Sequence, residues 1–249
     1  MILTAVVFGA AGGTIAQIVA SHFTGAAGTT VTVEPAQRLT GTSLDVATIA
    51  AQVEPSVVNL AVTTSLGRAA GTGIILTSDG SVVTNAHVVI GATSVSVTRA
   101  GSTTDLPAVV IAADRGADIA LLRINGAGGL PAARLADSDS AKVGDDVVAI
   151  GNALDLGAVP SVTRGVISGL DRSLPGTETD LAGLLQTDAA ISSGNSGGPL
   201  LNAAGQVIGV VTAAVTSNHA TTAEAVNFAI PINDALQVLK GFGVTVQGG

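Results

Sequence analysis

Short runs rich in Val, Ile and Thr recur along the 249 residues of this chain, and they limit the folds that it can adopt. Gly, Asp, Asn and Ser separate one run from the next, which is the pattern of β-strands joined by turns. The runs form two sets, at 57–64, 73–76, 82–84, 95–98, 108–112 and 119–124, and at 147–151, 162–170, 184–187, 207–216 and 226–230. We therefore predict an all-β fold of two antiparallel barrels with about six strands each.

Helical periodicity is confined to two stretches. One covers 44–53 and is stopped by Pro55, and the other covers 232–240 and is stopped by Gly241. A polar run at 137–140 (DSDS) interrupts the strands, so the boundary between the barrels is expected near 136–144. This places the first barrel in residues 43–140 and the second in residues 141–249.

Composition excludes several classes of function. With 47% hydrophobic residues and 32 glycines the chain can bury a core, but with four Phe, no Tyr and no Trp that core must consist of aliphatic side chains. The absence of cysteine rules out disulfides and thiolate metal sites, and the three histidines lack metal-ligand spacing. A net charge of −8 with only ten Lys and Arg argues against a nucleic-acid partner.

A serine lies beside clustered glycines in the segment 194–200 (GNSGGPL). Ser196 is the candidate nucleophile, and upstream stand a candidate base, His87, and a candidate carboxylate, Asp118. The order His, Asp, Ser is used on chymotrypsin-like double barrels, whereas subtilisins and α/β-hydrolases use other orders. The order of these residues thus agrees with the fold predicted from the strands.

The chemistry explains why these three residue types occur together. A serine hydroxyl is a weak nucleophile, so His87 would take its proton during attack and return it to the leaving amine. Asp118, expected to be buried at the start of a strand, would fix the imidazole tautomer. The 194–196 backbone of Gly194, Asn195 and Ser196 would form the oxyanion hole, with the amides of Gly194 and Ser196 as donors.

Each of these motifs also has a structural interpretation. A Gly-x-Ser-Gly-Gly sequence is often only a turn, a lone histidine is often structural, and Asp118 could simply cap a strand. The joint occurrence of three motifs in one order favours catalysis.

The chain resembles the trypsin-like serine proteases of the HtrA (Deg) type between about residues 44 and 246. The matching segments are 53–60 (VEPSVVNL), 70–76 (AGTGIIL), 148–152 (VAIGN), 186–191 (QTDAAI) and 226–232 (VNFAIPI). Two departures from the family pattern lie near the expected cleft, at Ser192-Ser193 and at Asn227. The resemblance implies a serine endopeptidase that acts through an acyl-enzyme on unfolded or exposed polypeptides, without a metal or organic cofactor.

The same resemblance places a substrate pocket in the second barrel. Ala190, six residues before Ser196, would form its floor, with wall contributions from Thr212, Ala213, Ala214 and Asn227. Because Ala190 supplies no carboxylate, we expect cleavage after small aliphatic residues rather than after Lys or Arg. Selectivity among these should be modest, since one methylene contributes only about 1–3 kcal/mol.

Regulation and assembly are less constrained by the sequence. Proteases of this type commonly carry a C-terminal PDZ domain, whereas residue 249 follows the predicted last helix closely. Many proteases of this type form homotrimers, so the resemblance implies a homotrimer for this chain as well. The alternative to an active enzyme is a latent protease-like module that senses or binds misfolded chains without cutting them.

The first residues suggest a location. Residues 1–20 are almost wholly apolar and no charged residue precedes Glu34, so residues 1–23 are a candidate membrane anchor or signal segment. Residues 24–42 would be a linker, and the protease would be extracytoplasmic, in the periplasm or cell envelope. The alternative of a dinucleotide site at 6–14 (VVFGAAGGT) is weaker, because Ile15 occupies the third glycine position and no further βαβ units follow.

Overall fold

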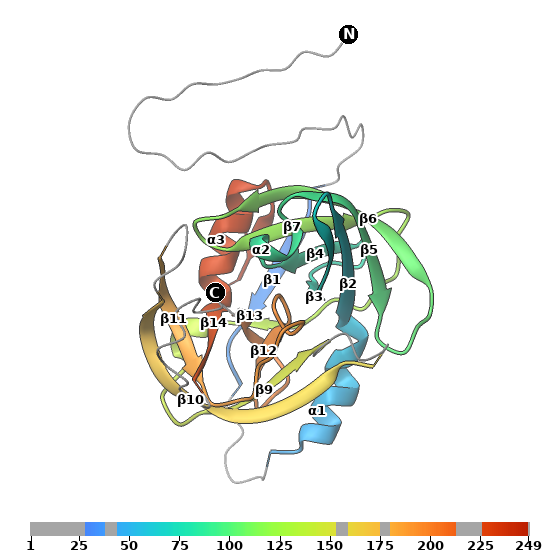
Figure 1. Cartoon of the computed structure of the whole chain (residues 1–249). Coiled ribbons are helices and arrows are strands. Elements are labelled where there is room, and N and C mark those ends of the chain that lie inside the picture. Colours follow the sequence, from blue (N-terminus) through green and yellow to red (C-terminus); the bar gives the residue numbers. More distant parts are fainter. Residues whose placement is uncertain (1–27, 38–43, 153–158, 175–179, 213–225, 249) are drawn as a thin grey trace.

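The computed structural model describes residues 28–37, 44–152, 159–174, 180–212 and 226–248. Within these ranges most of the chain forms short strands, with few and short helices. Figure 1 shows two sheets curled into barrels, one blue-green to green and the other yellow to red.

The first barrel is closed by six antiparallel strands in the neighbour order β2-β3-β4-β7-β6-β5. These are β2 (Val57–Thr64), β3 (Gly67–Ile75), β4 (Ser81–Thr84), β5 (Ala92–Arg99), β6 (Asp105–Asp114) and β7 (Ile119–Ile124). All six were predicted from the apolar runs, most of them with slightly narrower limits.

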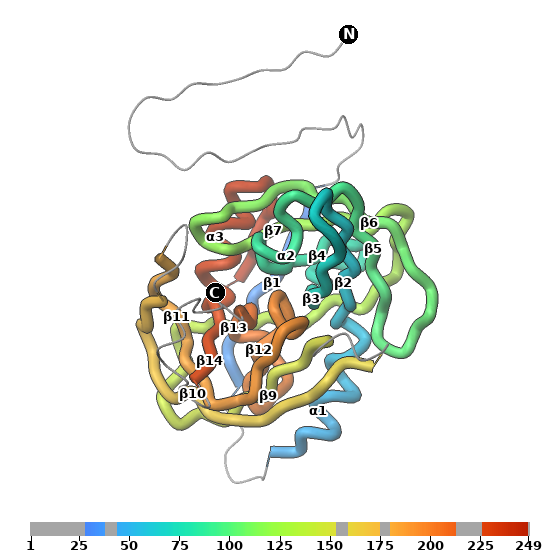
Figure 2. Tube along the Cα trace, viewed as in Figure 1, coloured from blue at the N-terminus to red at the C-terminus, as the bar shows by residue number. Residues whose placement is uncertain are grey.

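The second barrel has the neighbour order β12-β9-β10-β11-β14-β13, and pairing between β12 and β13 closes it. Its strands are β9 (Asp146–Gly151), β10 (Ser161–Leu174), β11 (Leu181–Thr187), β12 (Pro199–Asn202), β13 (Val207–Thr212) and β14 (Asn227–Pro231). The tube in Figure 2 follows the chain from one barrel to the other. The predicted all-β double barrel is confirmed, although the short strand β12 was missed in the sequence.

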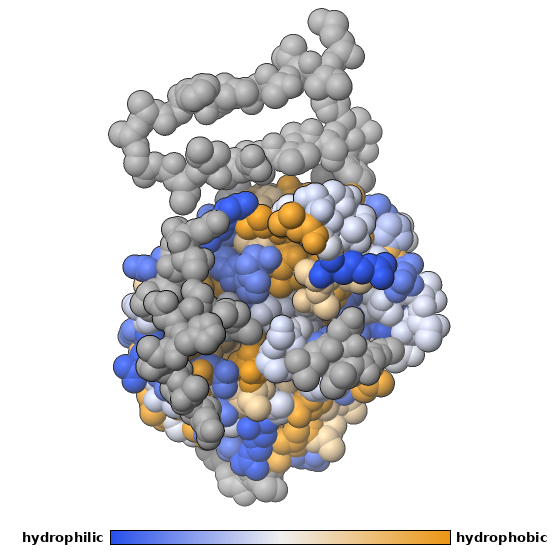
Figure 3. Space-filling model, viewed as in Figure 1, coloured by the Kyte–Doolittle hydropathy of each residue, from blue (hydrophilic) through white to orange (hydrophobic). Residues whose placement is uncertain are grey.

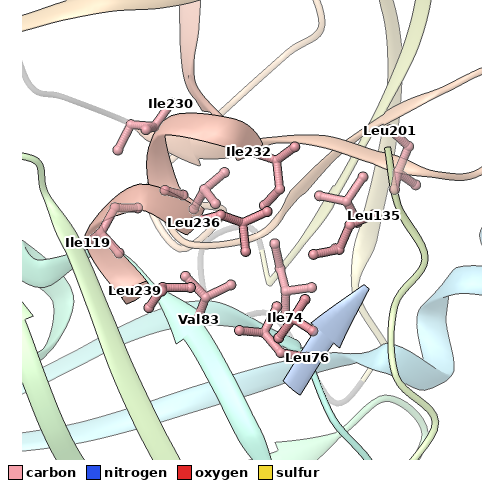
Figure 4. Close-up of a cluster of buried hydrophobic side chains, with 14 of the residues drawn as sticks. Ile74, Leu76, Val83, Ile119, Leu135, Leu201, Ile230, Ile232, Leu236 and Leu239 are labelled. Carbon is pink, nitrogen blue, oxygen red and sulfur yellow. The ribbon is translucent and has the colours of Figure 1, made fainter. Parts of the chain in front are cut away.

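Three apolar cores explain why successive residues of one strand are both hydrophobic. Ile75 faces the interior of the first barrel, whereas its neighbour Ile74 faces a core that both barrels share. In the second barrel Ala149 points inward and Ile150 points to the shared core. Figure 4 shows this shared core, to which strands of both barrels and α3 contribute. Each fully buried aliphatic side chain contributes about 1.5–3 kcal/mol, so the shared core fixes the barrels against each other.

The two predicted helices are confirmed within two residues at each end. Helix α1 (Val46–Val53) starts at Asp45, whose side chain accepts a hydrogen bond from the Thr48 amide, and the short helix η1 (Glu54–Ser56) follows it. Helix α3 (Ile232–Gly241) packs its apolar face into the shared core. The chain between the barrels forms β8 (Leu135–Ala136) and η2 (Ser138–Ser140), so the expected boundary at 136–144 falls between β7 and β9.

The stretch 24–42, expected to be a linker, contains a strand that is part of the folded domain. Strand β1 (Thr30–Glu34) pairs in parallel with β8 and with β15 (Thr245–Gln247) near the end of the chain. Val31 and Val33 are buried in the shared core, and this alternation of Val with polar residues is the signal that was overlooked.

Residues 1–23, the candidate anchor, lie outside the described residues. In the part of the chain that the structure describes, no helix has the length and apolar character needed to cross a membrane. Hydrophilic and hydrophobic side chains are interspersed on the face shown in Figure 3.

Candidate active site

His87 lies on a single helical turn at the mouth of the first barrel. This helix, α2 (Ala86–Val89), follows β4 directly, so the apolar residues Val88 and Val89 after the histidine are helical. The imidazole Nδ1 lies 2.9 Å from Asp118 Oδ2 and 3.0 Å from Oδ1. An Nδ1–H that donates to this carboxylate leaves Nε2 with a lone pair, which is the state required of a general base.

Asp118 is buried directly before β7, as its apolar neighbours predicted. Its backbone has φ 53°, a left-handed conformation that costs a non-glycine residue about 1–2 kcal/mol. The preceding turn holds this conformation, because Asp114 Oδ1 accepts hydrogen bonds from the amides of Gly116 and Ala117. The Asp118 carbonyl in turn accepts from Asn85 Nδ2 at 3.0 Å.

The Asp118 carboxylate has two further partners besides the imidazole. The His87 amide donates to Oδ1 at 3.0 Å, and Thr212 Oγ1, from the second barrel, donates to Oδ2 at 3.1 Å. Thr212 was expected in the wall of the substrate pocket, but the structure places its hydroxyl on Asp118.

The glycine-rich loop brings Ser196 against the first barrel. The carbonyl oxygen of Ser196 accepts a hydrogen bond from the Thr72 amide of β3 at 2.9 Å, and the Gly197 amide donates to Val211 O at 2.8 Å. Gly194 and Gly197 have φ values of 97° and 86°, which only glycine adopts without strain. The glycines around the serine are therefore required by the course of the backbone.

The amides of this loop differ in their partners. Asn195 N donates to Ser192 O at 3.0 Å, so this amide, which lies between the two predicted donors, is already engaged. Within the described residues the amide of Gly194, one of the predicted donors, has no backbone acceptor.

The expected pocket residues are only partly described. Ala190 is exposed, and its carbonyl oxygen accepts from Thr163 Oγ1 at 2.9 Å. Asn227 Nδ2 donates to the carbonyl oxygen of Ala189 at 2.9 Å, so the segment before the serine loop is held by two side chains. Ala213 and Ala214 lie outside the described residues.

The carboxylate of Asp188 is bound to the backbone of β10. Its Oδ1 accepts a hydrogen bond from the Val166 amide at 2.6 Å, and Gly165 leaves the room for this contact because a Cβ there would lie 2.3 Å from the same oxygen. This contact gives Asp188 a structural role. Among the described residues, no group of His, Asp and Glu has the arrangement of a metal site.

Comparison with known proteins agrees with this geometry. Residues 71–210 match the family model described as the trypsin-like peptidase domain. The chain belongs to the trypsin-like peptidase family. The matched range includes His87, Asp118 and Ser196, which are the residues selected from the sequence.

In sequence, the chain is similar to serine proteases of the HtrA type. It is 42% identical to a DegP-like periplasmic serine endoprotease of Ectopseudomonas mendocina over 72% of this chain and 36% of the relative. It is 45% identical to the magnetosome formation protease MamE of Paramagnetospirillum magneticum over 66% of this chain and 22% of the relative. The chain thus spans well under half the length of either relative.

A solved structure shows the same relationship. The HtrA-type protease AlgW with a tripeptide superposes with a TM-score of 0.71 and 34% identity, over 79% of this chain and 63% of that chain. The resemblance to HtrA (Deg) proteases that the sequence motifs indicated is confirmed.

Proposed function

We propose that this peptidase-family chain is an HtrA-type serine endopeptidase in which Ser196 is the nucleophile, His87 the general base and Asp118 the group that orients the imidazole. The observation that carries the proposal is the bond from His87 Nδ1 to the buried carboxylate of Asp118, next to a barrel strand that binds the Ser196 carbonyl. This combination supplies a base with a defined tautomer and a glycine-rich nucleophile loop at one barrel junction.

The reaction follows from these positions. His87 Nε2 takes the proton of Ser196 Oγ as that oxygen attacks the scissile carbonyl, and Asp118 stabilises the imidazolium without accepting the proton. The imidazolium then protonates the leaving amine, which gives an acyl-enzyme. A water molecule, deprotonated by the same Nε2, attacks the ester and releases the acid product and Ser196.

The negative charge of each tetrahedral intermediate needs preorganised donors. We assign these to the amides of Gly194 and Ser196, which flank the carbonyl position that the serine attacks. The loss of one such donor typically costs about 10²–10³ in kcat. The Gly194 amide supports this assignment, because it has no backbone acceptor among the described residues.

The substrate class follows from the pocket and from the relatives. Ala190 is exposed and Asn227 donates to the Ala189 carbonyl, so neither of these residues offers a carboxylate to a basic side chain. We propose cleavage after small aliphatic residues such as Ala, Val or Leu, in unfolded or exposed polypeptides. A peptide library with varied residues before the cleaved bond tests this, and a preference for Arg or Lys would contradict it.

Location and assembly are proposed from the relatives and from the first residues of the chain. The periplasmic name of the relative and the apolar residues 1–20 support an extracytoplasmic enzyme held at the membrane by its first residues. Fractionation of cells that express the full chain tests the location. A homotrimer, as in many HtrA proteases, is tested by light scattering of the same preparation.

The central experiment is labelling with a fluorophosphonate probe, with cleavage of unfolded casein measured in parallel. We expect the wild-type chain to be labelled and to cleave casein, and Ser196→Ala and His87→Ala to do neither. Ser193→Ala is the matched control, because it removes an exposed hydroxyl from the same loop and should keep both activities. A folded wild-type chain that is not labelled would identify the latent binding module instead.

A further inference from the structure

Thr72 lies where the first barrel meets the nucleophile loop, and it has no part in the mechanism described so far. It belongs to β3 and its side chain is fully buried. Its amide donates to Ser196 O at 2.9 Å, and its Oγ1 donates to Gly194 O at 2.7 Å. One residue of the barrel that carries His87 thus contacts two carbonyls of the loop that carries the serine.

The hydrogen bonds of the Thr72 hydroxyl have a fixed direction. The Asn152 amide donates to Thr72 Oγ1 at 2.9 Å, and an N–H can only be a donor. The hydroxyl proton is therefore free to be given to the Gly194 carbonyl, which can only accept. A hydroxyl is the group that can accept one of these bonds and donate the other at this buried position.

The peptide between Gly194 and Asn195 is consequently held at both ends. Its carbonyl oxygen accepts from Thr72 Oγ1, and its N–H donates to Ser192 O at 3.0 Å. With this peptide plane held, the chain on the C-terminal side of Gly194 is restrained from turning. The remaining freedom is the φ angle, which is 97° in the structure.

Glycine makes this restraint necessary. A glycine populates positive and negative φ about equally, so its chain neighbours alone do not decide which way the Gly194 N–H points. A rotation about Gly194 would turn this N–H away from the position of the oxyanion while leaving His87 and Asp118 in place. Because the Thr72 hydroxyl holds the Gly194 carbonyl from the other barrel, this rotation cannot be shared with the 194–195 peptide and would have to occur at the φ angle of Gly194 alone.

We propose that Thr72 is a positioning residue that keeps the Gly194 amide oriented as an oxyanion donor and so couples the assembly of the oxyanion hole to the contact between the barrels. This inference rests on the proposed function. Thr72 touches neither substrate nor the reacting atoms, and its effect is transmitted through the Gly194–Asn195 peptide.

The test compares Thr72→Val, which keeps the shape but lacks the hydroxyl, with Thr72→Ser, which keeps the hydroxyl. We expect Thr72→Val to lower kcat about 10- to 100-fold with little change in KM, because the lost interaction matters most in the transition state. A peptide boronate that forms a tetrahedral adduct should bind more weakly by a similar factor. Thr72→Ser should recover most of the kcat.

A stability control separates positioning from folding. Ser56→Ala removes another buried hydroxyl, which donates to Val53 O at 2.7 Å far along the chain from the nucleophile loop. It should lower the Tm but leave kcat and boronate binding unchanged. Equal kcat losses in Thr72→Val and Ser56→Ala would overturn the inference.

A readout that needs no activity keeps this inference distinct from the proposed function. The amide resonance of Gly194 in the ¹⁵N-labelled chain should shift or broaden in Thr72→Val and return near its wild-type position in Thr72→Ser. If the wild-type chain proves inactive, the proposed function fails, and this spectrum still decides whether Thr72 fixes the loop. An unchanged Gly194 resonance in Thr72→Val would overturn the positioning role.

Discussion

The two halves of the candidate active site are held in place by different means. In the first barrel, a side chain positions the proposed base: the carboxylate of Asp118 accepts hydrogen bonds from the imidazole and the amide of His87, and from Thr212 of the second barrel. In the second barrel, the backbone positions the nucleophile: the carbonyls of Gly194, Asn195 and Ser196 all accept hydrogen bonds, and left-handed glycines set the course of the loop.

This difference determines which changes each half tolerates. The base half depends on polar atoms, so it should be most sensitive to substitutions that alter a hydrogen-bonding group without changing its size. The nucleophile loop depends on close backbone approach, so it should be most sensitive to the addition of a single carbon. Thr72 is the point at which both kinds of restraint meet.

The largest expected effect in the base half follows from Asp118→Asn. The amide keeps the size of the side chain but can present an N–H to Nδ1, which would hold the imidazole in the wrong tautomer for accepting the serine proton at Nε2. We expect kcat to fall by about 10³–10⁴ while the chain stays folded. Steady-state peptide hydrolysis and thermal unfolding followed by circular dichroism measure the two quantities.

The matched control is Asp114→Asn, in the same loop. Its amide oxygen can still accept from Gly116 and Ala117, so kcat should stay within about threefold of the wild type. If Asp118→Asn lowered kcat by less than tenfold, side-chain chemistry would not determine the function of the base half. The proposed difference between the two halves of the site would then be wrong.

The sequence predicted the parts of this site that depend on residue type. His87, Asp118 and Ser196 could be selected because few other side chains supply a base, a carboxylate and a nucleophile, and the strand pattern placed them on two barrels. The double barrel itself could be predicted because its strands are continuous apolar runs, such as Ile74-Ile75, that are buried on both faces.

The parts that depend on tertiary contact could not be predicted. Thr72 and Thr212 lie on ordinary strands, and no local pattern shows that their hydroxyls reach Gly194 and Asp118 across the barrel junction. Strand β1 is a different case. The alternation of Val with Thr at 30–33 is a local signal that was overlooked, whereas the pairing of β1 with β8 and β15, which are far away in the sequence, has no such signal.

The nucleophile loop is tested by Gly197→Ala. A Cβ at this position would lie 2.2 Å from Thr72 O and 2.2 Å from Thr84 Oγ1, and φ is 86°. Because backbone must move to make room, we expect a loss of about 2–4 kcal/mol in the free energy of unfolding. Fluorophosphonate labelling should also slow about 100-fold, since the displaced loop carries Ser196 and its oxyanion donors.

A second glycine controls for the methyl group itself. Gly241 has an ordinary φ and open space around its Cβ position, so Gly241→Ala should change the free energy of unfolding by less than about 1 kcal/mol. Urea titrations of the three proteins give these values directly. If Gly197→Ala were as stable and as reactive as Gly241→Ala, close backbone approach would not be what holds the nucleophile half.

The smallest effect is expected where a side-chain contact lies far from both halves. Glu34 at the end of β1 accepts hydrogen bonds from Arg134 and Gln206, and the bond from Arg134 is the main cause that lowers the pKa of this carboxyl, while partial desolvation opposes it. A lowered pKa in the folded state stabilises the fold above the unfolded-state pKa of about 4.3, and this stabilisation is lost as the pH falls through the folded-state value.

Glu34→Gln should therefore lower the free energy of unfolding by only about 0.5 kcal/mol at pH 7, because the ion pair is largely exposed. The difference from the wild type should disappear at a lower pH, below the lowered folded-state pKa of Glu34, where the carboxyl is protonated in both states. Urea titrations at the two pH values measure it, and kcat should stay unchanged. A difference that persists at the lower pH would assign the contribution of Glu34 to packing of β1 rather than to charge. In that case the charge of a polar side chain would contribute to this protein where the side chain is buried, as in Asp118, and not where it is exposed, as in Glu34.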